Sequence, residues 1–384
     1  ENMEEDIISL LESVHPGESK KFPDLDSLIL TWKYISALPP NLRNIRLLYR
    51  FLKKKDIEKP KASLCIVHGF GEHSGRYINA AIHFALLGYG VHMIDFRHAG
   101  LSGGARAGHN LYELQSDINL LLQQPDPTIP CFLWGHSMGG LLVTTVLINN
   151  PQLPITGVII SAPFYGSSNA DISKGKEIAM KLATPLINQG VFNAFICPTS
   201  VSRDDLYIRA MFEDKKMLPL LGSSMALTMI EHLRPVVSQA SKMRHPVIFL
   251  HGNKDALTLC EVTQQVYKNC GSKDKTMVVL EGGYHEPHHD LERDEFLKKI
   301  SDWADQRLKE GKAYGYVAQI KIGSAGYQKM GKLCKALIAI GVLIYLGIAW
   351  KIRIPNMMAL ILKLGSFLLR LFWPITLLFK QIRV

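Results

Sequence analysis

The sequence predicts an α/β fold with a mostly parallel sheet and helices on both faces. From residue 25 onward, short apolar runs alternate with amphipathic stretches of helical length. One apolar run, residues 131–134, passes through Gly135-His136-Ser137-Met138-Gly139 into a second apolar stretch, residues 141–147. The length of 384 residues fits one large α/β domain with appendages, or two domains.

The strands and helices of this domain are bounded by glycines, prolines and polar clusters. Ser27–Ser36 and Asn44–Phe51 are expected to form two antiparallel edge strands. The remaining strands are expected at Leu64–His68, Val91–Phe96, Cys131–Trp134, Gly157–Ala162, Val247–Leu250 and Thr276–Leu280. The helices are expected at Tyr77–Leu87, Leu111–Gln124, Leu141–Leu147, Glu261–Asn269 and Leu291–Lys309.

The alternation stops between Phe164 and about Ala240, where the sequence indicates helical stretches without strands. We interpret residues 164–240 as an insertion over the carboxyl edge of the sheet, where open α/β folds bind ligands. A lid is the natural interpretation, and a plain helical layer is the alternative. The predicted organisation is an N-terminal segment (1–24), the α/β domain (25–310) and a hydrophobic tail (311–384).

A serine with glycines on both sides stands at the junction of strand and helix, which is the context of a nucleophile elbow. The turn is sharp, so small residues are needed two positions either side of Ser137, and Gly135 and Gly139 provide them. Gly140 gives further room where the helix approaches the strand. The turn would lift the Ser137 hydroxyl above the sheet at the positive end of the helix. A chance match is the alternative, which the flanking elements disfavour.

Serine chemistry of this kind needs a general base and an acid that orients it, in the chain order Ser, acid, His. Asp255 follows the strand Val247–Leu250, and His285 follows the last strand, so both lie at the edge that carries Ser137. Asp255 alone could be a turn residue or a helix N-cap. His288 and His289 compete with His285, which we prefer because it is closest to the strand end.

The loop His68-Gly69-Phe70-Gly71 is expected to complete the site. A tetrahedral intermediate needs N–H donors aimed at its oxyanion. In the elbow geometry one donor is the amide after the nucleophile, that of Met138, and the other comes from the loop after the first central strand, where Phe70 is placed.

Neither a metal nor a cofactor is expected. A zinc site from His285, His288 and His289 is disfavoured because Pro287 disrupts helical ligand spacing. The six cysteines form no C-x-x-C pair, so we expect reduced thiols: Cys65, Cys131, Cys197, Cys260, Cys270 and Cys334.

Three stretches together resemble the monoacylglycerol lipase group of α/β-hydrolases. They are His68-Gly69-Phe70-Gly71-Glu72-His73-Ser74-Gly75-Arg76-Tyr77, Gly135-His136-Ser137-Met138-Gly139-Gly140 and Gly282-Gly283-Tyr284-His285. Residues 95–102 resemble that family's D-x-x-G-x-G-x-S loop but have His98-Ala99 where a glycine is usual. The resemblance covers roughly residues 40–308.

The resemblance implies an α/β-hydrolase fold and cleavage of a fatty acyl ester, with monoacylglycerol as the expected substrate. It also implies that Glu72, Arg76 and His288 receive the glycerol hydroxyls; without it, Glu72 and Arg76 would be interpreted as a surface ion pair. The apolar stretch Met180–Phe195 suits an acyl chain or ordinary packing. Lysophospholipase, thioesterase and acyltransferase activities remain alternatives.

The positive charge of the chain is concentrated in its tail. Eleven of the Lys and Arg residues and no acidic residue follow Glu310, so residues 1–310 are nearly neutral and no nucleic acid partner is indicated. Ala336–Trp350 with two preceding residues would form roughly 27 Å of helix, just short of a bilayer core of about 30 Å. Met357–Phe379 is interpreted as an in-plane helix or a second span.

These features predict a membrane-tethered enzyme that contacts the bilayer through residues 333–384. Two helices packed on the soluble domain are the alternative for the tail. An accessory subunit of a membrane complex, with partner chains, is the alternative function. Reduced cysteines indicate a reducing compartment. The sequence begins at Glu1 rather than Met. A mitochondrial membrane would fit if a leader preceded Glu1.

Overall fold

The computed structural model describes residues 3–37, 45–104, 106, 109–166, 191–194 and 196–310. The predictions for the tail, residues 311–384, and for most of Met180–Phe195 lie outside these residues. Among the described residues, no helix combines the length and the apolar character that a membrane crossing requires.

The described part of the chain builds a nine-stranded sheet in the order β1-β2-β3-β5-β4-β6-β7-β10-β11. β5, β4, β6, β7, β10 and β11 run parallel, and β1, β2 and β3 are antiparallel. This confirms the mostly parallel sheet and the antiparallel edge. The strands are β1 Met3–Glu4, β2 Leu28–Ala37, β3 Ile45–Lys54, β4 Ala62–Val67, β5 Tyr89–Ile94, β6 Cys131–His136, β7 Gly157–Ser161, β10 Val247–Gly252 and β11 Lys275–Leu280.

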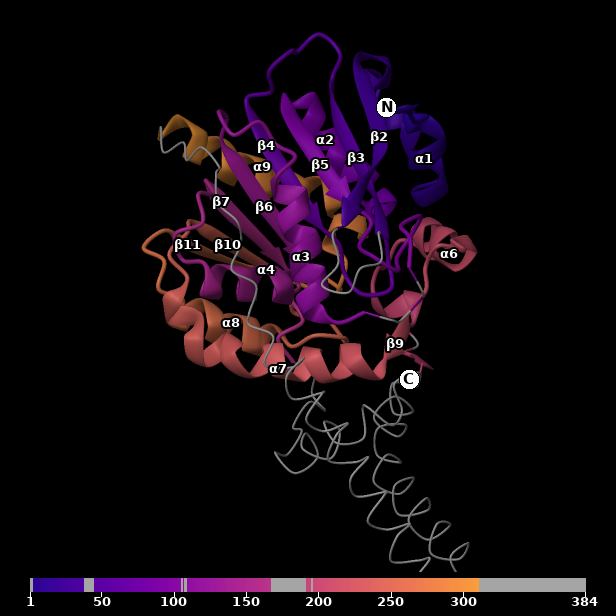
Figure 1. The fold of residues 1–384 in the computed structure, drawn as a ribbon. Coiled ribbons are helices and arrows are strands. Elements are labelled where there is room, and N and C mark those ends of the chain that lie inside the picture. The colour runs from indigo at the N-terminus through magenta and orange to yellow at the C-terminus, as the bar shows by residue number, and fades with distance from the viewer. Residues whose placement is uncertain are drawn as a thin grey trace, which may run out of the picture. The chain divides into compact units, whose positions relative to one another are not determined.

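Helices cover both faces of the sheet (Figure 1). On one face, α2 (Ile78–Leu86) packs with α9 (Arg293–Lys309). The other face carries α3 (Leu111–Leu122), α4 (Met138–Asn149) and α8 (Cys260–Asn269). The central strands are buried along their whole length, which explains why their sequences are continuous apolar runs rather than alternating ones.

The described residues of the N-terminal segment (1–24) join the same sheet and core as the rest of the described chain. β1 pairs with β2, and α1 (Ile7–Val14) follows directly. The Asp6 carboxylate caps α1 by accepting from the Ile8 amide at 2.9 Å. One side of α1, including Leu11 with no exposed surface, packs into the main core. The domain in the described structure therefore begins with β1.

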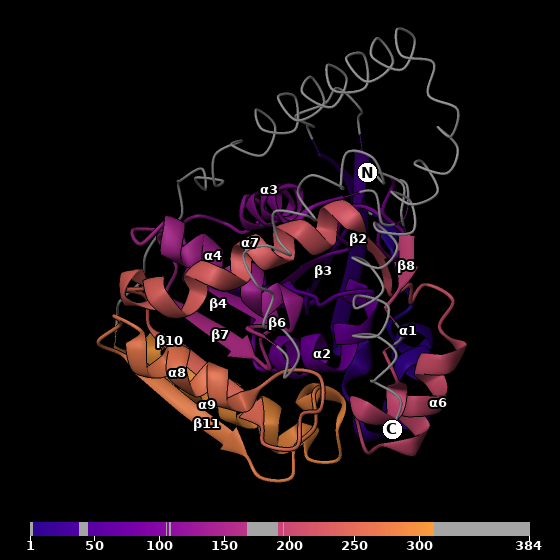
Figure 2. The ribbon, with the colours of Figure 1, turned by 90° about the horizontal axis from the view of Figure 1, so that it is seen from below.

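The insertion contains strands, so the prediction of helices alone was wrong. β8 (Val191–Asn193) pairs antiparallel with β9 (Leu220–Gly222). Strands of three residues are too short to show a sequence period, and their pairing joins segments far apart in the chain. The insertion also contains helices, as predicted. α6 (Asp205–Glu213) lies beside α1, and α7 (Ser223–Gln239) contacts α3, α4 and α8 (Figure 2).

The insertion lies on the loop that follows β4. The Leu218 amide donates to the Gly71 carbonyl at 2.8 Å, and a Cβ on Gly71 would lie 2.7 Å from the Pro219 backbone. Gly71 also has φ of 75°, a conformation that favours glycine. Both the positive φ and the lack of room for a Cβ therefore require glycine at position 71. This contact places Leu218 and Pro219 of the insertion beside the loop at the carboxyl edge of the sheet.

Candidate active site

The turn between β6 and α4 has the strained geometry of a nucleophile elbow. Ser137 adopts φ 52° and ψ −119°, a region that non-glycine residues rarely occupy. A Cβ on Gly135 would lie 2.5 Å from the Gly139 carbonyl oxygen, and one on Gly139 would lie 2.3 Å from the Val67 carbonyl oxygen. The crowding that the sequence motif predicts is therefore present on both sides of Ser137.

Three predicted side chains meet at the carboxyl edge of the sheet. His285 Nε2 lies 2.9 Å from Ser137 Oγ, and His285 Nδ1 lies 2.7 Å from Asp255 Oδ2. His285 as a residue is only 5% exposed. Its two competitors lie elsewhere: His288 stacks on Tyr77, and His289 contacts His15 at 2.9 Å. Among the candidates, His285 alone bridges the serine and the carboxylate.

The Asp255 carboxylate is surrounded by donors. Its Oδ1 accepts from the amides of Leu257 and Thr258, at 2.8 and 3.0 Å. Its Oδ2 accepts from the Thr258 hydroxyl at 2.7 Å and lies 3.0 Å from His251 Nε2. Burial alone would raise the pKa of Asp255, but the charge of His285 and the hydrogen bonds from His251 and His285 lower it well below its ordinary value. The group is therefore held as a carboxylate.

The contact between Asp255 and His285 also shifts the pKa of His285. Burial lowers the pKa of this imidazole, but the Asp255 carboxylate, with smaller contributions from Glu286 and Glu72, raises it above the ordinary value of 6.5. The imidazole is thereby made a better proton acceptor.

Two residues not predicted from the sequence, His251 and Thr258, both touch Asp255. Both lie within four residues of Asp255: His251 near the end of β10 and Thr258 in the loop that follows it. Nothing in the residue pattern indicates which way they point. Thr263, on α8, lies 2.8 Å from His251 Nδ1 and holds the ring in place.

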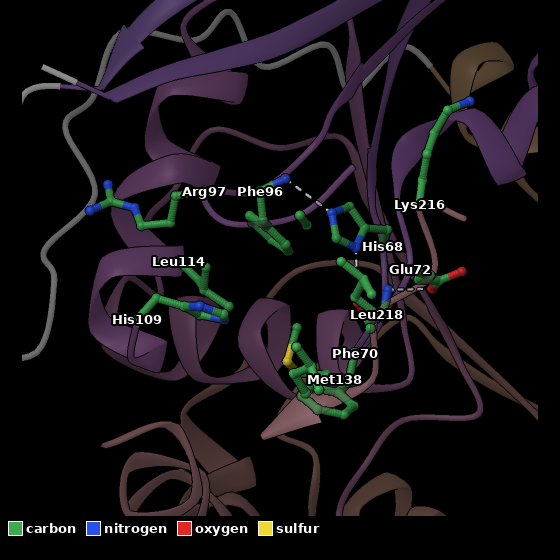
Figure 3. Close-up of a pocket in the computed structure, with 14 residues that line it drawn as sticks. His68, Phe70, Glu72, Phe96, Arg97, His109, Leu114, Met138, Lys216 and Leu218 are labelled. Carbon is green, nitrogen blue, oxygen red and sulfur yellow. Dashed lines mark hydrogen bonds between the residues drawn. The ribbon is translucent and has the colours of Figure 1, made fainter. Parts of the chain in front are cut away.

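Phe70 and Met138 line one pocket, where Figure 3 shows them side by side. Gly69 lines it too and lies against Ser137, since a Cβ on Gly69 would be 3.2 Å from the serine Cβ. Within the described residues, the amides of Phe70 and Met138 donate to no acceptor. The other lining residues are mixed. Phe96, Leu114, Leu218 and Leu220 are apolar, and the polar or charged ones are His68, Glu72, Arg97, His109 and Lys216.

Of the three residues that the resemblance places around the glycerol hydroxyls, the structure puts only Glu72 at the pocket. Arg76 is 1% exposed and His288 has no exposed surface. Neither lines this pocket, and their role as substrate contacts stays a prediction of the resemblance. Glu72 and Arg76 do form an ion pair, with 3.1 Å between Oε2 and Nε, but the pair is buried rather than on the surface.

The described residues contain no group of three His, Cys, Asp or Glu side chains placed to hold a metal ion. Five cysteines fall within these residues, and all five are free thiols. Cys65 and Cys131 lie on neighbouring strands with their sulfur atoms 4.0 Å apart.

Comparison with known proteins decides the family. The family model of serine aminopeptidase S33 (Hydrolase_4) matches residues 58–292, more than half of the chain. The chain belongs to this family. Its match to an abhydrolase domain-containing protein of Dictyostelium discoideum is 30% identical over 258 residues, which cover 66% of this chain and 27% of that longer protein. Mouse monoglyceride lipase is 27% identical over 289 residues, covering 70% of this chain and 91% of the lipase.

A solved structure of a related enzyme supports the same family assignment. The monoacylglycerol lipase of Paleococcus ferrophilus is 25% identical with a TM-score of 0.61, over 68% of this chain and 99% of that protein. The fold is an α/β-hydrolase fold similar to that of monoglyceride lipases. The chain is accordingly an enzyme of the carboxylic ester hydrolase class.

Proposed function

We propose that this enzyme is a serine hydrolase that cleaves monoacylglycerol to glycerol and a free fatty acid. The observation that carries the proposal is the position of His285, which lies 2.9 Å from Ser137 Oγ and 2.7 Å from Asp255 Oδ2. This spacing is what nucleophilic catalysis by a serine requires. The similarity to monoglyceride lipases supports the choice of substrate.

In the proposed mechanism, His285 removes the proton from Ser137 as the hydroxyl attacks the ester carbonyl. The amides of Phe70 and Met138 donate to the resulting oxyanion. His285 then gives the proton to the leaving glycerol oxygen, which leaves an acyl ester on Ser137. A water, deprotonated by the same imidazole, attacks this ester, and the fatty acid is released as the Ser137 hydroxyl reforms. Asp255 stabilises the imidazolium in both steps.

The pocket beside Ser137 supports a fatty acyl substrate. Its walls carry Phe96, Leu114, Leu218 and Leu220, next to the amides proposed to hold the oxyanion. Apolar walls with a few polar groups are typical of sites for apolar ligands. Lysophospholipids, thioesters and acyl transfer offer the same acyl group and differ in the leaving or accepting group.

The substrate is tested by comparing esters that share one acyl chain. We expect the enzyme to release oleate and glycerol in equal amounts from 1-oleoylglycerol, with a higher kcat/KM than for oleoyl lysophosphatidylcholine or oleoyl-CoA. If kcat/KM is higher for oleoyl lysophosphatidylcholine or for oleoyl-CoA, that compound replaces monoacylglycerol as the proposed substrate. Release of oleate from none of the three would remove the acyl ester proposal.

We also propose that residues 333–384 hold the enzyme at a membrane, in a reducing compartment. The support is the sequence of the tail, which combines long apolar stretches with basic residues and has no acidic residue. A tethered enzyme would meet substrates that dissolve in the bilayer. Flotation of the full chain with phosphatidylcholine vesicles tests this; a chain that stays with the soluble fraction would contradict it.

The proposed base also predicts how activity depends on pH. His285 can accept the serine proton only when neutral, and Asp255 raises its pKa above 6.5. We therefore expect kcat/KM to fall as pH decreases, with a midpoint above 6.5. Initial rates with a soluble short-chain ester between pH 5 and 9 measure this limb. A flat profile down to pH 5 would show that no histidine of raised pKa acts as the base.

A further inference from the structure

A buried arginine lies between two carboxylates that belong to the two loops of the proposed site. Arg76 Nε donates to Glu72 Oε2 at 3.1 Å, and Arg76 Nη2 donates to Glu286 Oε2 at 2.8 Å. Glu286 directly follows His285 in the chain, and Glu72 lies two residues after Phe70. All three charged residues are buried, with exposures of 1% for Arg76, 3% for Glu72 and 5% for Glu286. One guanidinium thus joins both loops.

On the first loop, Glu72 holds the backbone next to the proposed oxyanion donor. Glu72 Oε1 accepts from the Gly69 amide and from the Tyr77 hydroxyl. Gly69 packs against Ser137, so there is little room for it to move toward the serine. Figure 3 shows the Glu72 carboxylate reaching back to this loop. The position of the Phe70 amide therefore depends on where Glu72 is held.

On the second loop, Glu286 ties the backbone after His285 to the insertion. Its carboxylate accepts from the Tyr207 hydroxyl of α6, and its amide donates to the Val201 carbonyl at 2.8 Å. The Tyr207 ring also lies 5.1 Å from the Arg76 guanidinium. The side chain after His285 is therefore held from two directions, by α6 and by Arg76.

We propose that Arg76 is a positioning residue, which sets the loop carrying the Phe70 amide relative to the loop carrying His285. This inference rests on the proposed function. It differs from a substrate contact, because Arg76 is buried and its Nε and Nη2 donors are taken by protein carboxylates. A planar guanidinium can donate in two directions at once, whereas a lysine ammonium is a point donor on a flexible stem. Lysine at this position would keep the charge and lose the bridge.

The test is Arg76→Lys, with kcat and KM measured on two esters of the same acyl chain, 1-oleoylglycerol and p-nitrophenyl oleate. The second ester has no glycerol hydroxyls. We expect kcat to fall about 10²-fold, and by the same factor on both esters. A displacement of about 1 Å between reacting groups has an effect of that size. KM should change little. A loss confined to the glycerol ester, with a raised KM, would make Arg76 a substrate contact and overturn the inference.

Glu286→Gln provides a second variant that keeps the size of the side chain and the pairing of Arg76 with Glu72. It should lower kcat on both esters in the same way, and the double variant with Arg76→Lys should lose less than the product of the two single losses. Wild-type kcat in Glu286→Gln would contradict the bridge even if Arg76→Lys fails to fold, which its thermal unfolding would reveal.

Arg307→Lys is the matched control, because Arg307 is also a buried arginine paired with a carboxylate, that of Asp274. Arg307 lies on α9, outside the site described above, so the variant should leave kcat unchanged.

The outcomes distinguish the proposed function from the positioning role of Arg76. Turnover of both esters that requires Ser137 supports the proposed function whatever Arg76 does, and unchanged kcat in the Arg76 and Glu286 variants removes only the positioning role.

Discussion

Ser137→Ala is expected to lower kcat for ester hydrolysis by roughly 10⁴-fold or more, because the nucleophile is lost and only binding and the oxyanion donors remain. The variant should also fail to react with a fluorophosphonate probe. Alanine can keep the backbone of the turn, since the strain at φ 52° does not depend on the hydroxyl. Hydrolysis of 1-oleoylglycerol and gel detection of the labelled chain measure the two effects.

The control for this variant is Ser13→Ala, which removes a serine hydroxyl from α1, outside the site. It should retain both hydrolysis and labelling. Undiminished turnover in Ser137→Ala would show that another residue attacks the ester. Loss of labelling in Ser13→Ala would show that the assay reports loss of the fold rather than loss of the nucleophile.

Asp255→Asn is expected to lower kcat by roughly 10⁴-fold while the protein stays folded. The reason is the direction that the new amide must take. Two backbone amides, of Leu257 and Thr258, donate to the Oδ1 position, so the carbonyl oxygen of asparagine belongs there. Its NH₂ group then faces His285 Nδ1, which lies 2.7 Å from Oδ2 in the native protein. The imidazole must accept this hydrogen bond, so its proton moves to Nε2, toward the serine it should deprotonate.

Single-turnover acylation and fluorophosphonate labelling rates measure this effect, and both should fall together with kcat. The matched control is Asp302→Asn on α9, a side chain paired with Lys298 and largely exposed; it should react at the native rate. A loss smaller than tenfold in Asp255→Asn would show that His285 keeps the correct tautomer without the carboxylate. His251 or Thr258, both in contact with Asp255, would then need to orient the ring.

Much of the site was predictable because it depends on local rules. The glycines around Ser137 are required by crowding within one turn, which the sequence states directly. Asp255 and His285 follow parallel strands, and the carboxyl ends of parallel strands share one edge of a sheet. The antiparallel pair of β2 and β3 was also predictable, because each strand is long enough to show its residue pattern.

Contacts between distant segments could not be predicted. The resemblance implied that Glu72 and Arg76 receive the glycerol hydroxyls, and without it they would be interpreted as a surface ion pair. The structure buries them, since Glu286, some 210 residues later, supplies the second carboxylate for Arg76. His288, which the resemblance also placed at the glycerol hydroxyls, packs against the Tyr77 ring with no exposed surface.

The sequence by itself determined the α/β class, the elbow at Ser137 and the order of the acid and the base, because each follows from spacing along a strand or a turn. Only the tertiary structure decided which histidine reaches Ser137, which donors surround Asp255 and how Arg76 joins the two loops. Side-chain direction in a loop depends on what packs against it. In this enzyme the neighbours come from α1, α6 and the loop after β11, which meet only in the folded chain.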